Sequence, residues 1–208
     1  MSRIVKAGII QMANKLDTSA SPQEHREAML EAHRPYIEDA GRQGVQMLCF
    51  QEIFTGPYFC PSQDAKWYAA AEAIPDGPTT QLMCEYARKY SMVIVVPIYE
   101  EHMTGVYYNT AAVIDADGRY LGKYRKAHIP QVAGFWEKFF FRPGNLGFGV
   151  WRSMGANIGM AICNDRRWSE TYRVMGLKAV EIIALGFNSP AQLPGLPEQN
   201  HLRAFHHT

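Results

Sequence analysis

The stretch ANIGMAICNDRRWSETYRVMGLK (residues 156–178) decides the fold of this chain. Its apolar run at 158–162 predicts a strand that is buried on both faces of a sheet, and Cys163 stands at the end of that strand. Ser169 is a suitable N-cap for a following helix whose apolar residues, between 172 and 177, would pack onto the sheet. The stretch therefore predicts an α/β fold with Cys163 at the strand end, where such sheets bind ligands.

Cys163 has two interpretations. A cysteine in an apolar strand is most often a small core residue. However, the residues that follow it, NDRR at 164–167, include two cations, and the N-terminus of a helix comes next. Both features lower the pKa of a thiol, and the thiolate is the nucleophilic form. We therefore expect a reactive thiol with a depressed pKa.

Two more strand ends carry polar side chains. VQMLCFQEIF (45–54) places Glu52 just past an apolar strand, and YLGKYRKAHIP (120–130) places Lys126 just past another. Each residue alone is consistent with a solvated strand terminus. Three polar groups at three strand ends favour a shared site.

The rest of the chain alternates between strand and helix patterns. Strands are expected over residues 5–12, 45–50, 92–100, 106–115 and 179–187. SPQE at 21–24 is a capping box that begins a helix to about residue 40, with Pro35 as a point where the helix kinks or ends early. A second helix is expected over 77–90. The Asp-Gly pair at 117–118 predicts a hairpin turn, so a meander leads to Lys126.

Composition favours an enzyme-sized globular domain. The chain has 208 residues with 47% hydrophobic content, so we expect one domain over residues 1–208 with a sizeable core. The net charge is +1, and the basic residues are spread along the chain. We therefore expect a small-molecule substrate and no nucleic acid.

Cysteine spacing and hydropathy indicate the compartment. The four cysteines form no CxxC pair and no short regular spacing, so neither a disulfide framework nor a zinc knuckle is expected. No run approaches the roughly 18 apolar residues of a membrane span, and the first twelve residues enter a strand instead of a signal peptide. These features predict a cytoplasmic protein without a membrane partner.

Three ordered motifs carry a family resemblance. FQE at 50–52, KYRKAHIP at 123–130 and AICNDRRW at 161–168 resemble the Glu, Lys and Cys motifs of the nitrilase (carbon-nitrogen hydrolase) superfamily. The segments most similar to the N-carbamoyl-D-amino acid amidohydrolases are 163–183, FNSP at 187–190 and HLRAFHH at 201–207. Residues 128–147 look closer to the β-ureidopropionases. The resemblance covers essentially the whole chain.

The resemblance implies a fold and an assembly. The family fold is a four-layer αββα sandwich, which dimerises through the helical face at the nucleophile, so a homodimer or higher homo-oligomer is expected. The family continues into further strands beyond the helix expected at 198–208, so the chain is expected to be truncated at its C-terminus. An unpaired sheet edge there would lower its stability.

The resemblance also implies the site. Glu52 would be the general base, Cys163 the nucleophile, and Glu137, in the aromatic-rich segment 128–147, a second active-site glutamate. Lys126 and the backbone N–H of Asn164 would hold the oxyanion. Substrate contacts are expected from Asn164, Arg166, Arg167, Asn188 and His128. From its position alone, Asn188 is equally a turn residue, and the aromatic segment is equally core filler.

The implied reaction needs no cofactor and no metal. His201, His206 and His207 are not joined by a carboxylate or cysteine at ligand spacing, so no metal site is expected. The expected reaction releases an amino acid, ammonia and CO2 from an N-carbamoyl amino acid whose carboxylate meets Arg166 or Arg167. For these arginines the alternative is a structural salt bridge to Asp165 or Glu170.

Phe135 stands where the carbamoylases have a histidine, and four alternatives therefore stay open. They are β-ureidopropionase, aliphatic amidase or nitrilase activity, and a catalytically silent binding protein with the same fold.

Overall fold

The structure, a computed structural model, describes residues 4–188. In chain order its elements are β1 (Ala7–Ile10), α1 (Pro22–Arg42), β2 (Met47–Phe50), η1 (Ala65–Ala70), α2 (Pro78–Tyr90), β3 (Val93–Met103), β4 (Val106–Ile114), β5 (Tyr120–Arg125), β6 (Gln131–Val132), β7 (Phe135–Trp136), η2 (Glu137–Phe139), β8 (Val150–Ser153), β9 (Ala156–Ile162), η3 (Cys163–Arg167), α3 (Ser169–Leu177) and β10 (Ile182–Gly186), where η marks a 3-10 helix. The loop expected after Asn188, the last expected helix and its three histidines lie outside the described residues.

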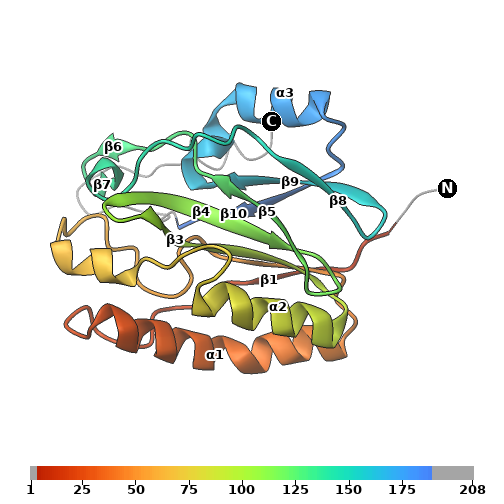
Figure 1. Cartoon of the computed structure of the whole chain (residues 1–208), viewed down its shortest axis with the longest axis horizontal. Helices are drawn as coiled ribbons and strands as arrows, with labels where there is room; N and C mark the ends of the chain where they lie inside the picture. Colours follow the sequence, from red (N-terminus) through yellow and green to blue (C-terminus); the bar gives the residue numbers. More distant parts are fainter. Residues whose placement is uncertain (1–3, 189–208) are drawn as a thin grey trace, which may run out of the picture.

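Four layers are stacked in the order helix, sheet, sheet, helix (Figure 1). The first sheet has the strand order β1-β2-β3-β4-β5, and the second has the order β10-β9-β8. Helices α1 and α2 cover the outer face of the first sheet, and α3 lies on the outer side of the second (Figure 1). This is the expected αββα sandwich, because each sheet buries one face against helices and the other against its neighbour.

Strand direction brings several strand ends to one side of the molecule. β1, β2 and β3 are parallel, whereas β4 is antiparallel to both β3 and β5. β5 therefore runs in the same direction as β2. In the second sheet, β9 and β10 are parallel and β8 is antiparallel to β9. The segments that follow β2, β5, β9 and β10 can therefore lie next to one another.

β2 shows how the alternation of side chains builds two cores. All four of its residues are buried. Leu48 and Phe50 belong to the core between the first sheet and its helices, while Met47 and Cys49 belong to the core between the two sheets. Successive side chains of a strand point to opposite faces, so one apolar run supplies both cores.

The two sheets are in close contact at Gly186, the last residue of β10. A Cβ atom there would lie 2.9 Å from Cγ of Pro97 and 3.0 Å from the carbonyl oxygen of Phe50. Glycine permits this contact because it has no side chain. The end of β10 is therefore held against the end of β2, just before Glu52.

Most local signals in the sequence are confirmed. The Ser21–Glu24 capping box begins α1, and the β4–β5 hairpin turns at Gly118, whose φ is +83°. Pro35 does not end α1, which continues to Arg42.

The expected N-cap at Ser169 is wrong. α3 begins at Ser169 itself, and its cap position is Trp168, which makes no side-chain cap hydrogen bond. The reason is that residues 163–167 already form the 3-10 turn η3, and the Trp168 N–H donates to the carbonyl oxygen of Asp165. Within residues 4–188, no helix combines the length and apolar character required to cross a membrane.

Candidate active site

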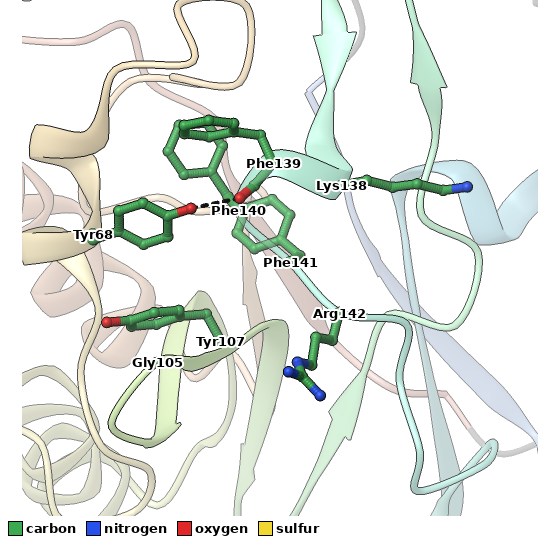
Figure 2. A pocket seen from close by; sticks show the side chains of 8 residues that line it. All are labelled: Tyr68, Gly105, Tyr107, Lys138, Phe139, Phe140, Phe141 and Arg142. Carbon is green, nitrogen blue, oxygen red and sulfur yellow. Dashed lines mark hydrogen bonds between the residues drawn. The ribbon is translucent and has the colours of Figure 1, made fainter.

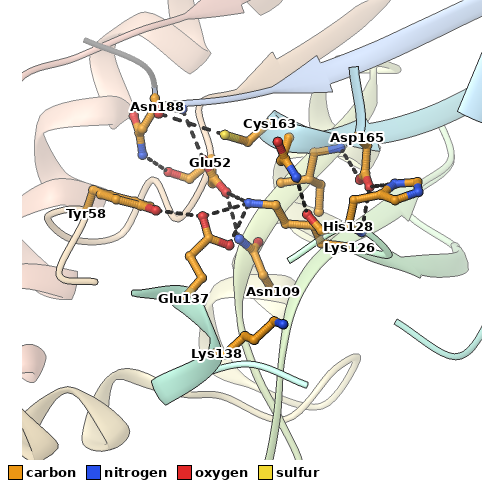
Figure 3. Close-up of polar contacts among 12 residues, drawn as sticks. Glu52, Tyr58, Asn109, Lys126, His128, Glu137, Lys138, Cys163, Asp165 and Asn188 are labelled. Atoms are coloured by element: carbon orange, nitrogen blue, oxygen red, sulfur yellow. Dashed lines mark hydrogen bonds and ion pairs between the residues drawn. The ribbon is translucent and has the colours of Figure 1, made fainter. Parts of the chain in front are cut away.

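Side chains from three strand ends converge in a buried cluster (Figure 3). The Lys126 ammonium lies 2.9 Å from Oε1 of Glu52, and 2.8 and 2.7 Å from the two carboxylate oxygens of Glu137. All three side chains are 0% exposed. The Cys163 sulfur, one Glu52 oxygen and one Glu137 oxygen all lie within 4.8 Å of one another. The structure therefore brings together the four residues expected to carry the chemistry.

The fold explains this convergence. Lys126 comes directly after β5, Cys163 directly after β9, and Glu52 two residues after β2. Glu137 opens η2, just after the short β6–β7 hairpin. Rigid sheet elements thus hold three of the four side chains.

Glu52 is held as a hydrogen-bond acceptor. Its Oε1 accepts from Nδ2 of Asn109 at 2.7 Å as well as from Lys126, and its Oε2 accepts from the backbone N–H of Asn188 at 3.1 Å. The Asn188 side-chain amide donates to the carbonyl oxygen of Glu52 at 2.6 Å. Asn188 therefore contacts the general-base candidate directly.

Glu137 shares one ammonium with Glu52. The Tyr58 hydroxyl donates to its Oε1 at 2.6 Å. Burial raises the pKa of the Glu137 carboxyl to about 7, against the opposing effect of Lys126, and the Glu52 charge adds to the rise. One buried ammonium cannot neutralise two buried carboxylates, so one of them gains affinity for a proton.

Lys126 remains charged in this environment. Burial by itself lowers the pKa of its ammonium group, but the negative charges of Glu52, Cys163 and Glu137 outweigh that effect and raise the pKa above its ordinary value. A permanently positive group beside the sulfur suits the stabilisation of negative charge on a bound substrate.

The pKa of the Cys163 thiol differs from the lowered value expected from the sequence. Burial, with the nearby Glu52 carboxylate, raises its pKa to about 12 instead of depressing it, although Lys126 and Arg166 oppose the rise. The thiol is only 4% exposed, so loss of hydration outweighs the cations. Cys163 also adopts a φ of +45°, a conformation that costs energy for a side-chain-bearing residue and is concentrated at functional sites.

The two arginines lie in different environments. Nη1 of Arg166 donates to the carbonyl oxygen of Cys163 at 2.8 Å and lies 3.7 Å from its sulfur. Arg166 is buried, whereas Arg167 is exposed. Arg166 is therefore part of the nucleophile's immediate surroundings.

Hydrogen bonds join His128 to the turn that contains Asn164 and Asp165. Nδ1 of His128 lies 2.8 Å from Oδ1 of Asp165, and its ring stacks on Trp168 with centroids 4.9 Å apart. The Asn164 side-chain amide donates to the carbonyl oxygen of His128 at 3.0 Å. The His128 side chain is 26% exposed, so these contacts do not fully cover it.

Sequence reasoning missed three polar partners in and around this cluster. Asn109 interrupts the apolar pattern of β4, and a polar residue in a buried strand is a usable signal. Tyr58 lies in a loop and offers no such signal. Asp165 was considered only as one of four polar residues after the cysteine and as a salt-bridge partner for the arginines.

Two hollows lie near these residues. One, of about 290 Å³, includes Tyr58, Asn188, Gln11 and Gln51 in its lining and so reaches partners of both glutamates. The other, of about 500 Å³, lies among aromatic rings that include Tyr68, Tyr107 and Phe139 (Figure 2). In that view Lys138 extends away from the rings. The smaller hollow therefore borders the buried cluster.

A metal ion would need the same atoms that Lys126 already binds. Glu52, Glu137 and Cys163 form a group of three possible ligands. The Lys126 ammonium bonds to both carboxylates and supplies a positive charge at that position. This arrangement is that of an ion-pair network within the described part of the chain.

Known proteins resemble this chain over nearly its whole length. A family model described as carbon-nitrogen hydrolase matches residues 6–207. An N-carbamoylputrescine amidase of Solanum lycopersicum is 35% identical over 97% of this chain and 65% of that protein. A β-ureidopropionase of Arabidopsis thaliana is 35% identical over 94% and 48%. A citrullinase of Francisella tularensis is 36% identical over 79% and 58%. The chain thus spans about half to two thirds of these relatives.

Solved structures agree on the fold. A carbon-nitrogen hydrolase from Helicobacter pylori G27 is 27% identical with a TM-score of 0.85, covering 98% of this chain and 67% of that one. A double mutant of an amidase from Nesterenkonia sp. AN1 is 19% identical with a TM-score of 0.69, covering 90% and 68%. The latter similarity supports the fold alone.

Proposed function

Because this chain belongs to the carbon-nitrogen hydrolase family, we propose that it hydrolyses an N-carbamoyl amino acid through a covalent intermediate on Cys163. The products are the amino acid, ammonia and CO2. The observation that carries the proposal is the buried contact of Glu52, Lys126 and Glu137 beside the Cys163 sulfur.

The first step is activation of the thiol. A pKa near 12 leaves almost no thiolate at neutral pH, so the sulfur needs a base. Glu52 is the base, because its carboxylate has an oxygen within 4.8 Å of the sulfur and is held by Asn109 and Asn188. As the proton moves to Glu52, the sulfur attacks the carbamoyl carbon and forms a C–S bond.

The attack places a negative charge on the carbonyl oxygen. The Lys126 ammonium and the backbone N–H of Asn164 stabilise that charge. Removing one donor of this kind typically lowers the rate by about 100- to 1,000-fold. Glu137 holds Lys126 through two hydrogen bonds and so fixes the ammonium in place.

The tetrahedral intermediate then collapses to a covalent intermediate on Cys163, and water hydrolyses that second intermediate. The bond from the carbamoyl carbon to its terminal nitrogen breaks, and Glu52 returns its proton so that ammonia leaves. Glu52 next takes a proton from water, which attacks the carbonyl carbon of the thiocarbamate on Cys163. The C–S bond breaks, the thiol regains a proton, and the released N-carboxy amino acid loses CO2.

Arg166 and Arg167 are proposed to bind the substrate carboxylate. Guanidinium groups match carboxylates in a bidentate fork. Arg166 lies 3.7 Å from the sulfur, so a short amino acid bound to Cys163 would place its carboxylate within reach. His128 and Asn188 are proposed to line the same substrate. A charge-assisted contact is worth about 1.5 to 3 kcal/mol, or roughly 10- to 150-fold in binding.

An N-carbamoyl diamine is the second candidate substrate. It is favoured by the similarity, at 35–39% identity, to proteins named N-carbamoylputrescine amidase. Such a substrate carries an ammonium group where an N-carbamoyl amino acid carries a carboxylate. The two classes therefore require opposite charges in the part of the site that holds the distal group.

A substrate panel scored by ammonia release tests the proposal. It contains N-carbamoyl amino acids, β-ureidopropionate, citrulline, an N-carbamoyl diamine, simple amides and nitriles, with Cys163→Ala as the blank. N-carbamoyl α-amino acids are expected to give the highest kcat/KM. Preference for the diamine selects the second candidate, and preference for simple amides or nitriles refutes both. No ammonia from any compound supports a catalytically silent protein.

Arginine variants separate carboxylate binding from catalysis. Arg167→Ala is the cleaner test, because Arg166 also bonds to the Cys163 carbonyl. Arg167→Ala is expected to raise KM for N-carbamoyl amino acids about tenfold or more while sparing neutral amides. Arg166→Ala is expected to slow both substrate classes. Equal effects of Arg167→Ala on the two classes would contradict carboxylate recognition by Arg167.

We also propose that the protein acts as a homodimer, or higher homo-oligomer, in the cytoplasm. α3 and its neighbouring Trp168 expose apolar side chains, with Trp168 47%, Tyr172 41% and Leu177 78% exposed. A second copy packed on this face would bury them. The four cysteines are free thiols, which suits a reducing compartment. Light scattering of Leu177→Glu against wild type tests the assembly, and an unchanged mass would place the interface elsewhere.

A further inference from the structure

The Asp165 carboxylate, which lies beside His128 in Figure 3, is buried and accepts four hydrogen bonds. Its Oδ1 accepts from the backbone N–H of His128 at 3.0 Å and lies 2.8 Å from Nδ1 of the same residue. Its Oδ2 accepts from the Tyr124 hydroxyl at 2.8 Å and from the backbone N–H of Ile162 at 3.0 Å. Both oxygens are therefore fully used by groups of the protein itself.

These four bonds join two segments that carry different parts of the cluster. Tyr124, in β5, and His128 stand on either side of Lys126 in the sequence, whereas Ile162, the last residue of β9, immediately precedes Cys163. The bond to Ile162 closes the turn around Cys163, and the other three attach that turn to the segment of Lys126. A single carboxylate therefore links the segment that carries the thiol to the segment that carries the ammonium.

We propose that Asp165 is a positioning residue that fixes the Cys163 sulfur relative to the Lys126 ammonium. The inference rests on the proposed function, because it concerns the alignment of nucleophile and oxyanion stabiliser. Misplacement of a reacting group by about 1 Å can lower a rate on the order of 100-fold. Asp165 itself does not touch the sulfur or the substrate.

The arrangement requires a carboxylate and not an amide. Asp165 holds one backbone N–H on each oxygen, and a backbone N–H can only donate. In Asp165→Asn, one of the two oxygens becomes an NH2 group, which also donates. Whichever way the amide is turned, either the N–H of Ile162 or that of His128 loses its acceptor. One of the two attachments is therefore broken.

Two further variants separate positioning from stability. Tyr124→Phe removes one of the three bonds that attach the Cys163 turn to the segment of Lys126, and it also removes the acceptor of the Ala127 backbone N–H, so it is a graded variant and not a control. Thr79 lies at the start of α2, outside the cluster, and its hydroxyl donates to the buried carboxylate of Glu72. Thr79→Val removes that hydroxyl. Both variants lose a buried hydrogen bond, so both are expected to lower the melting temperature.

The test measures kcat, KM, the melting temperature and the rate at which iodoacetamide alkylates Cys163 in each variant. Asp165→Asn is expected to lower kcat and Cys163 alkylation tenfold or more, with KM changed less than threefold. Thr79→Val is expected to stay within about threefold of wild type on both rates, and Tyr124→Phe is expected to fall between Thr79→Val and Asp165→Asn. Alkylation needs no substrate, so it tests positioning even if the panel shows that the proposed reaction is wrong.

Asn164→Ala gives an independent test if Asp165→Asn does not fold. It removes a further side-chain bond between the two segments, the one from the Asn164 amide to the His128 carbonyl, while the backbone N–H of Asn164 remains. A fall in kcat of about three- to tenfold at nearly unchanged KM is expected. The proposal is overturned if the rates of the folded variants only follow their melting temperatures, or if Asp165→Asn speeds alkylation of all four cysteines together.

Discussion

Replacing Glu137 with glutamine should change how stability depends on pH. Glu137 is fully buried and shares the Lys126 ammonium with Glu52. Burial raises the pKa of its carboxyl to about 7, from an ordinary value of 4.5. Between pH 4.5 and about 7, Glu137 therefore keeps its proton in the folded protein and releases it in the unfolded chain. This contribution to stability is fully present below pH 4.5 and is lost as pH rises through 7.

The magnitude follows from that difference in pKa. One pKa unit corresponds to about 1.4 kcal/mol, so the free energy of unfolding of wild type should lose about 2 to 3 kcal/mol from Glu137 between pH 5 and pH 8. Glutamine has nearly the same shape and does not titrate. The free energy of unfolding of Glu137→Gln, relative to wild type, should therefore rise by about 2 to 3 kcal/mol over the same range.

Urea denaturation at pH 5, 6, 7 and 8 measures the effect, because the midpoint and slope give the free energy of unfolding at each pH. Glu85→Gln is the control, since Glu85 is an exposed residue of α2 and its replacement should not alter the pH profile. Parallel profiles for wild type and Glu137→Gln would refute the reasoning. They would mean that Lys126 holds Glu137 ionised throughout.

Three further changes have expected outcomes. Cys163→Ala should abolish ammonia release in a coupled assay while Cys49→Ala retains it, and activity in Cys163→Ala would disprove the nucleophile. Lys126→Met leaves two buried carboxylates without a cation, so urea denaturation should show a loss of about 3 to 5 kcal/mol at pH 8 and a smaller loss at pH 5, where protons replace the cation. Phe54→Ala removes a fully buried ring from the core under α1 and should cost about 3 to 5 kcal/mol by the same method. A loss under 1 kcal/mol would show that this part of the core repacks.

The sequence was sufficient where neighbouring residues decide the structure. The capping box at Ser21, the Asp-Gly turn before β5 and the apolar run of β9 each contain their own physical cause. Because these signals are local, the element order and the α/β class followed from them. The three motifs then gave the family and its layered fold, and both are confirmed.

Local reasoning failed where the answer depends on contacts distant in sequence. Ser169 fits an N-cap pattern, yet the preceding 3-10 turn, closed by the bond from Ile162 to Asp165, takes the chain into α3 without it. The partners Tyr58 and Asn109 come from a loop and from β4, and only the tertiary fold, which orders β2, β3 and β4 in one sheet, brings them to the glutamates.

The sequence by itself determined which chemical groups stand at the strand ends: a carboxylate at 52, an ammonium at 126 and a thiol at 163. The tertiary structure alone decided the protonation of the thiol. Adjacent cations suggested a thiol with a lowered pKa, whereas in the folded protein burial raises it to about 12. Charge–charge effects are visible in a sequence, but loss of hydration depends on how completely two sheets exclude water, and here that term is the larger one.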